Sequence, residues 1–172
     1  CEGGKFNLQV GQDRCNNCPQ GFFQSLPGQT ACTRCPAGSI MPSTGASACQ
    51  NCTRGTFTAA SGAYSCDSCP IGQFIAAAGQ SHCDKCPVGT FQKSTGAFQC
   101  DACVAGRFSS SAGLGDCVDC PVGKFNNATG QSFCTDCPAG SFQDQAGSRS
   151  CVVCPKGQFT DSRGSVGCKS CK

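Results

Sequence analysis

The sequence predicts a small disulfide-rich repeat fold: an extended rod or superhelix of about ten 17-residue stapled hairpins, with little regular secondary structure. The first observation is that cysteine recurs every 17 residues along the chain, in two series that lie three residues apart. The second is that two glycines and one aromatic residue recur with the same period. A repeat of this length indicates an array in which each repeat packs on its neighbours.

Composition is the third observation. The chain has 21 cysteines in 172 residues, no tryptophan and one tyrosine. Leu, Ile, Val and Phe are too scarce to fill the core of one large globule, and cysteine at this density is typical of disulfide scaffolds. Small repeats held by covalent bridges are therefore expected.

Aligned on the period, the repeat is C-P-x-G-x-F-x(4)-G-x(3)-C-x-x, after which the next cysteine opens the next repeat. We call its two cysteines the opening and the closing cysteine, and its two glycines the first and the second glycine. Repeats 1 to 10 open at Cys1, Cys18, Cys35, Cys52, Cys69, Cys86, Cys103, Cys120, Cys137 and Cys154, and Cys171 opens a truncated one. Residues 1–172 are thus expected to be one tandem array, cut from a longer chain.

The glycines and aromatics are equally regular. The first glycines are Gly4, Gly21, Gly38, Gly55, Gly72, Gly89, Gly106, Gly123, Gly140 and Gly157. The second glycines are Gly11, Gly28, Gly45, Gly62, Gly79, Gly96, Gly113, Gly130, Gly147 and Gly164. The aromatic is phenylalanine in every repeat except one, where Ile40 replaces it.

The cysteines can pair in two ways. Pairing each opening cysteine with the closing cysteine 14 residues on uses Cys1 and leaves only Cys171 over. Pairing within each C-x-x-C instead leaves Cys1 without a partner and closes tight loops, which are usually strained or redox-active. We favour the long loops: Cys1–Cys15, Cys18–Cys32, Cys35–Cys49, Cys52–Cys66, Cys69–Cys83, Cys86–Cys100, Cys103–Cys117, Cys120–Cys134, Cys137–Cys151 and Cys154–Cys168.

Each part of the repeat has an expected role. Gly-x-Phe-x forms a short extended arm. The second glycine lies in the turn, where positive φ suits it. The segment before the closing cysteine forms the returning arm, and the two residues after it form a short linker. A bridge across a loop of this size contributes about 3 kcal/mol, and the Phe of one repeat is expected to cover the adjacent disulfide.

Charge and hydropathy exclude several classes of partner. The net charge is +3 and neither sign forms a run, so no nucleic-acid partner is expected. No stretch approaches 18 apolar residues, so no membrane span is expected in this segment. Cysteine at this density indicates an oxidising compartment, and we therefore expect an extracellular or cell-surface protein.

Zinc coordination is the chemical alternative to disulfide bonding for these cysteines. C-x-x-C pairs at intervals are also a spacing of zinc ligands. We expect no metal or other cofactor, because Cys1 would then have no role and each repeat has its own Gly and Phe. His82 is the single histidine and the carboxylates are scattered, so no catalytic residue and no enzyme are expected. A zinc-binding array stays the remote alternative.

Two sequons are candidates for N-linked glycosylation. Asn127 begins Asn-Ala-Thr in the turn region. Asn51 begins Asn-Cys-Thr, which has a bridged cysteine at its centre and lies between two cysteines. We therefore rank Asn127 above Asn51.

The combined pattern C-x-x-C-P-x-G-x-F, with a second glycine before the next C-x-x-C, resembles ephrin-receptor-like cysteine-rich repeats. It is also similar to the single-bridge modules of tumour-necrosis-factor receptors. The resemblance covers the whole chain and implies an extracellular, disulfide-bonded, elongated ectodomain. In receptors such modules are mixed with other types, whereas here one type repeats without variation.

We therefore expect a non-catalytic extracellular structural protein that forms a stalk, a surface coat or a filament, such as a flagellar hair. Its expected partners are other protein chains, either copies of itself or filament components. The alternative is a receptor or adhesion ectodomain that binds a protein ligand.

Overall fold

The computed structural model describes residues 1–9 and 14–171. Within these ranges it contains twenty strands of two residues each and no helix. The strands pair into ten two-stranded sheets, one for each repeat, and each repeat carries one disulfide. The prediction of stapled hairpins with little regular secondary structure is therefore confirmed.

The first strand of each hairpin contains the recurring aromatic. These strands are β1 (Lys5–Phe6), β3 (Phe22–Phe23), β5 (Ser39–Ile40), β7 (Thr56–Phe57), β9 (Gln73–Phe74), β11 (Thr90–Phe91), β13 (Arg107–Phe108), β15 (Lys124–Phe125), β17 (Ser141–Phe142) and β19 (Gln158–Phe159). Their partners are β2 (Asn16–Asn17), β4 (Thr33–Arg34), β6 (Gln50–Asn51), β8 (Asp67–Ser68), β10 (Asp84–Lys85), β12 (Asp101–Ala102), β14 (Val118–Asp119), β16 (Thr135–Asp136), β18 (Val152–Val153) and β20 (Lys169–Ser170).

The returning strand is the one element that the sequence analysis placed wrongly. It consists of the two residues after the closing cysteine, which were expected to be a linker, and not of the segment before that cysteine. In repeat 2, for example, Phe22 pairs with Arg34 and Phe23 with Thr33 in antiparallel register. The N–H of the next opening cysteine, Cys35, then donates to the carbonyl of Gly21 and closes the hairpin. The repeats are therefore joined by a hydrogen-bonded strand.

The core consists mainly of sulfur. The opening cysteines of repeats 2 to 9 are at most 1% exposed. The aromatic after each first glycine is only half-buried, and Phe159 is exposed. That these rings cover the adjacent disulfides stays a prediction.

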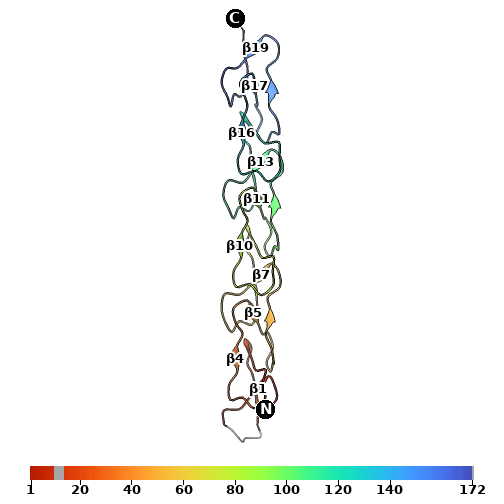
Figure 1. Ribbon diagram of the computed structural model, residues 1–172, viewed down its shortest axis with the longest axis vertical. Helices are drawn as coiled ribbons and strands as arrows, with labels where there is room; N and C mark the ends of the chain where they lie inside the picture. Colours follow the sequence, from red (N-terminus) through yellow and green to blue (C-terminus); the bar gives the residue numbers. More distant parts are fainter. Residues whose placement is uncertain (10–13, 172) are drawn as a thin grey trace. The chain divides into compact units, whose positions relative to one another are not determined.

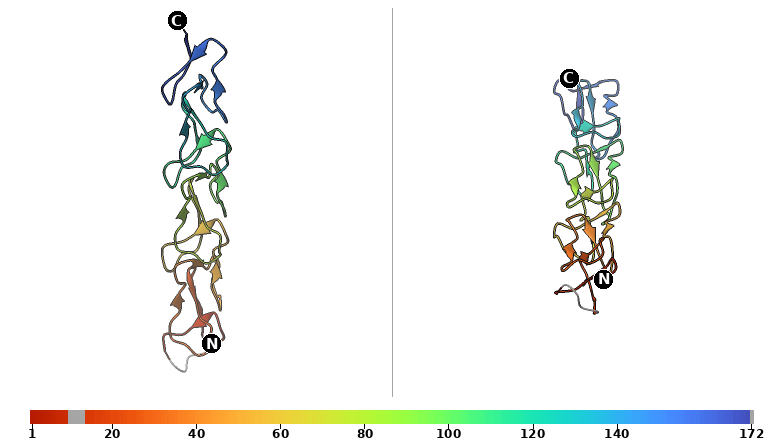
Figure 2. Two further views of the ribbon diagram at one scale, coloured as in Figure 1. Left: turned by 45° about the horizontal axis from the view of Figure 1, so that its top comes forward. Right: turned by 60° about the horizontal axis from the view of Figure 1, so that its bottom comes forward.

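The chain divides into two compact units. The first comprises Cys1–Pro70, Phe74–Asp84 and Thr95–Gln99, and the second comprises Ile71–Gln73, Lys85–Ser94 and Cys100–Lys172. Within each compact unit the hairpins are stacked one after another in sequence order. Figures 1 and 2 show this for the first unit at the red and orange end of the chain and for the second unit at the blue end. Each compact unit is thus an extended repeat array. A rod or superhelix formed by the whole chain stays a prediction.

Candidate functional site

Backbone hydrogen bonds join each repeat to the next. The N–H of a first glycine donates to the carbonyl of the residue that follows the aromatic in the next repeat, as from Gly38 to Thr58 at 2.9 Å. The N–H of a second glycine donates to the opening cysteine of the preceding repeat, as from Gly62 to Cys35 at 2.7 Å. Both bonds occur at all nine junctions in the described part of the chain, and each bond joins residues of one compact unit.

A third backbone bond accompanies them at eight of these junctions. The N–H of the residue after the aromatic donates to the residue after the second glycine in the next repeat, as from Gln24 to Ala46 at 3.1 Å. A backbone hydrogen bond contributes about 1 kcal/mol net, so a junction gains about 3 kcal/mol from these bonds. Because all the partners are backbone atoms, the junction persists although the side chains differ between repeats.

The first glycine also contacts the repeat after the next one. Gly38 has φ of +83°, in the left-handed region that favours glycine. A Cβ atom built on Gly38 would approach the carbonyl oxygen of Gly79 more closely than real Cβ atoms do. The same relation holds for Gly4–Gly45, Gly21–Gly62, Gly55–Gly96, Gly72–Gly113, Gly89–Gly130, Gly106–Gly147 and Gly123–Gly164, each pair inside one compact unit. At these eight positions the first glycine is therefore required for two reasons, conformation and close approach. Gly11, the second glycine of repeat 1, lies outside the described residues.

The residue after the aromatic is a structural position that the sequence analysis missed. In repeat 2 Gln24 is buried, its Oε1 accepts from the N–H of Leu26 at 3.1 Å, and its Nε2 donates to the carbonyl of Ala31 at 2.8 Å. Gln143 makes the matching pair of bonds in repeat 9. The position holds a polar residue in every repeat except two, where Met41 and Ile75 stand. The recurrence of a polar residue at this position in the sequence could have predicted its structural role.

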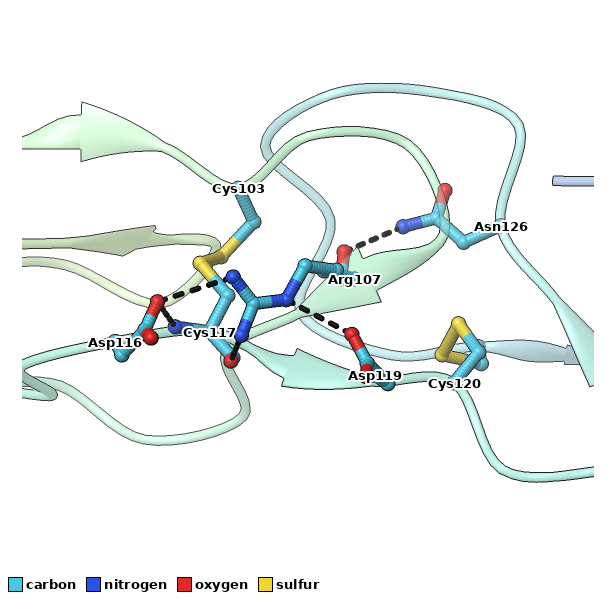
Figure 3. Close-up of polar contacts among 8 residues, drawn as sticks. Cys103, Arg107, Asp116, Cys117, Asp119, Cys120 and Asn126 are labelled. Carbon is cyan, nitrogen blue, oxygen red and sulfur yellow. Dashed lines mark hydrogen bonds and ion pairs between the residues drawn. A yellow bond between two sulfur atoms is a disulfide. The ribbon is translucent and has the colours of Figure 1, made fainter. Parts of the chain in front are cut away.

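A network of several side chains surrounds Arg107 on β13 (Figure 3). Its guanidinium donates to Asp116 at 3.1 Å, to Asp119 at 2.9 Å and to the carbonyl of Cys117. Asp119 lies directly across the hairpin from Arg107. The Asn126 side chain of the next repeat donates to the Arg107 carbonyl at 2.9 Å. The network therefore fastens one hairpin internally and connects it to its neighbour.

The next hairpin has a simpler ion pair of the same kind. Lys124 Nζ lies 2.6 Å from Asp136 Oδ1, across the β15–β16 pair. Both carboxylates are more than 45% exposed in the two cross-strand pairs. Exposed ion pairs of this type contribute little to stability, so their contribution is to hairpin register.

The pKa of Asp116 lies below its usual value of 3.8, first because its carboxylate accepts from the N–H of Cys117 at 2.8 Å and second because of Arg107. A lowered pKa in the folded state stabilises the fold above pH 3.8, and this contribution disappears as the pH falls through the lowered value. We expect Arg107→Gln to raise the pKa of Asp116 only part of the way back, because the Cys117 bond remains. NMR titration of the carboxyl carbon measures this shift, and an unchanged midpoint would contradict the assignment.

In the structure the ten disulfides join the pairs that the 14-residue spacing favours. They are Cys1–Cys15, Cys18–Cys32, Cys35–Cys49, Cys52–Cys66, Cys69–Cys83, Cys86–Cys100, Cys103–Cys117, Cys120–Cys134, Cys137–Cys151 and Cys154–Cys168. Cys171 is unpaired and exposed among the described residues. The C-x-x-C pairing does not occur in this structure.

Residues with other chemistry are not gathered together. Across residues 1–9 and 14–171, no three His, Cys, Asp or Glu side chains form a group that could hold a metal ion. His82 is exposed and lies 4.0 Å from Asp84, which is also exposed. In the same ranges no helix has the length and apolar character to cross a membrane.

The two sequons have different surroundings. Asn127, Ala128 and Thr129 are all exposed. Asn127 also lines a shallow groove of about 370 Å³ in the second compact unit. Asn51 is exposed too, but its Cγ and Nδ2 atoms lie 3.3 and 3.4 Å from the position of a Cβ on Gly79, and Cys52 at the centre of its sequon is 1% exposed.

Comparison with known proteins gives one result. The sequence model of the family described as tyrosine-protein kinase ephrin type A/B receptor-like matches residues 4–48, 38–79, 72–113, 106–150 and 128–171. These matches concern the cysteine-rich repeats, a non-catalytic type of module that is typical of extracellular proteins. No curated protein matches the chain. The predicted resemblance to ephrin-receptor-like repeats is therefore confirmed.

Proposed function

Because the chain belongs to the ephrin-receptor-like family of cysteine-rich repeats, we propose that it is a non-catalytic extracellular structural protein. Its array serves as a stiff spacer in a stalk, a surface coat or a filament, and a flagellar hair is one such filament. Its ten disulfides suit an oxidising extracellular compartment.

The observation that carries this proposal is the uniform junction between repeats. A chain of independent hairpins would bend at each linker, but here the linker residues form a strand. Each junction adds backbone bonds to the next repeat, and the first glycines pack against the repeat beyond it. Such an array resists bending, because a bend at one junction must break contacts with two following repeats.

The exposed side chains support a structural role over ligand binding. Some of the large apolar residues on the surface recur at one position of the repeat, as Ile71, Val88 and Val122 do, and others, such as Leu26 and Phe133, stand alone at theirs. Scattered apolar residues are normal on a protein surface and do not mark a binding patch. The proposed partners are therefore copies of this chain or other filament components, which would contact the array along its length.

Small-angle X-ray scattering on the whole chain tests the proposed spacer. A compact domain of 172 residues has a radius of gyration of about 16 Å. We expect a value far above this, together with the scattering profile of a stiff, thin particle. A radius of gyration near the compact value would contradict the proposal. Scattering at rising protein concentration detects self-association, and a mass that stays that of one chain would remove the self-partner proposal.

A further inference from the structure

We propose that Asn127 carries an N-linked glycan whose first sugar packs on the ring of Phe125, and that Asn51 carries none. This inference rests on the proposed extracellular location, because the chain must enter the secretory pathway to be glycosylated. It goes beyond the structural role by assigning a modification site and the surface that receives the sugar.

The turn that presents Asn127 is held by its neighbour. Asn126 is buried, its Oδ1 accepts from the N–H of Ala128 at 3.0 Å, and its Nδ2 donates to the carbonyl of Arg107 at 2.9 Å. These bonds fix the backbone on both sides of Asn127 while its own side chain is exposed. The asparagine that receives a glycan must be accessible in this way.

The groove beside Asn127 fits one sugar ring. It is about 370 Å³ in volume and is lined by Phe125, Asn127, Pro138, Ser141, Arg149 and Val153, among others. Its walls combine the half-buried Phe125 with the exposed polar side chains of Arg149 and Ser150. A pyranose has one apolar C–H face, which packs on an aromatic ring, and hydroxyls, which bond to polar groups. Because Asn127 itself lines the groove, a sugar linked to it reaches this surface without a second binding event.

Asn51 is also exposed, but its surroundings differ from those of Asn127. Its side chain packs against Gly79, two repeats further along the first compact unit. The centre of its sequon, Cys52, is buried and bridged to Cys66. A glycan on Asn51 would be attached at Nδ2, which lies 3.4 Å from the Cβ position of Gly79, so it would crowd the contact between these repeats.

The modification is a transfer from a lipid-pyrophosphate-linked oligosaccharide. The side-chain amide nitrogen of Asn127 forms a bond to C1 of the first N-acetylglucosamine, and the bond from C1 to the pyrophosphate oxygen breaks. The amide loses one proton and the lipid pyrophosphate leaves with the electron pair. No oxidation or reduction is involved.

The test is expression of the whole chain through a eukaryotic secretory pathway, followed by glycopeptide mass spectrometry. We expect an oligosaccharide on the peptide that contains Asn127 and none on the peptide that contains Asn51. Thr129→Ala should abolish the modification, and Thr129→Ser should retain it. Secreted protein with all ten disulfides but an unmodified Asn127 would overturn this inference alone, whereas free thiols in that protein would overturn the proposed function.

A matched variant tests whether the repeat itself presents the site. Lys93 occupies the place of Asn127 in repeat 6, with Phe91 before it and Thr95 after it. Residues 93–95 are exposed, and the Gln92 Oε1 accepts from the N–H of Ser94 at 2.9 Å, as Asn126 does for Ala128. Lys93→Asn should therefore gain a glycan, and its failure to do so would contradict the role given to this turn.

A second variant tests the contact with the ring. In wild type, the glycosylated chain should melt about 2 °C above Thr129→Ala, the scale expected for one aromatic contact. Phe125→Leu removes the ring but keeps an apolar side chain. In this background the glycan should still be attached, but Thr129→Ala should no longer lower the melting temperature. If Thr129→Ala lowered the melting temperature as much in the Phe125→Leu background as in wild type, the proposed packing of the sugar on Phe125 would be overturned.

Discussion

Gly89→Ala is expected to destabilise the protein by more than about 3 kcal/mol, in the range seen when a substitution forces an overlap with backbone. Gly89 has φ of +80°, and a Cβ atom on it would overlap the carbonyl of Gly130, two repeats further on. The new methyl group therefore adds backbone strain and also forces the two repeats apart. Urea unfolding with the disulfides intact measures the change in free energy.

Gly140→Ala is the matched control. Gly140 has φ of +81° and donates to Thr160 as Gly89 donates to Ser109, both at 2.8 Å. No atom lies within 4 Å of its Cβ position. Alanine there should cost only the left-handed strain, about 1–2 kcal/mol. Equal losses in the two variants would mean that the contact two repeats away contributes nothing.

Removing one internal disulfide is the second large effect. Replacement of Cys103 and Cys117 by alanine should cost at least about 3 kcal/mol, because their bridge closes a loop of this size in the unfolded chain. The loss should exceed that figure, since both sulfur atoms are buried, with Cys103 0% and Cys117 4% exposed, and alanine leaves a cavity. Thermal or urea unfolding of the double variant measures the loss.

The bridge Cys154–Cys168 provides the comparison. It spans the same 14 residues, but both of its cysteines are only half-buried. Its removal should cost about 3 kcal/mol without a large cavity contribution. If removal of Cys154–Cys168 lowered the free energy of unfolding as much as removal of Cys103–Cys117, burial of sulfur between repeats would not stabilise the array.

Much of the hairpin could be predicted from the period alone. Cys1 limits the ways in which the cysteines pair, and the glycines mark the turns. The returning strand could not be predicted, because Asn16 and Asn17 look like a polar linker. A strand of two residues is also too short to show the alternation of apolar and polar residues that marks a strand in a sequence. With that strand misplaced, the pairing of Arg107 with Asp119 across the hairpin also could not be foreseen.

The long-range role of the first glycine was hidden for a different reason. An invariant glycine in a single sequence indicates either positive φ or close approach, and does not say which atoms approach. Gly38 and Gly79 are 41 residues apart, and only the packing of the repeats brings them together. The candidate glycosylation sites were visible as sequons, but the contact of Asn51 with Gly79 two repeats away, which Asn127 does not make, required the structure.

Native-state hydrogen exchange, followed by NMR on the intact oxidised chain, tests most directly whether the repeats act as one array. The amides of the internal first glycines donate to the next repeat, whereas the amides of the opening cysteines donate within a hairpin. Protection of Gly38 and Gly106 comparable to that of Cys52 and Cys120 is the predicted result. Rapid exchange of the glycine amides together with slow exchange of the cysteine amides would contradict it, because the hairpins would then be folded independently of one another.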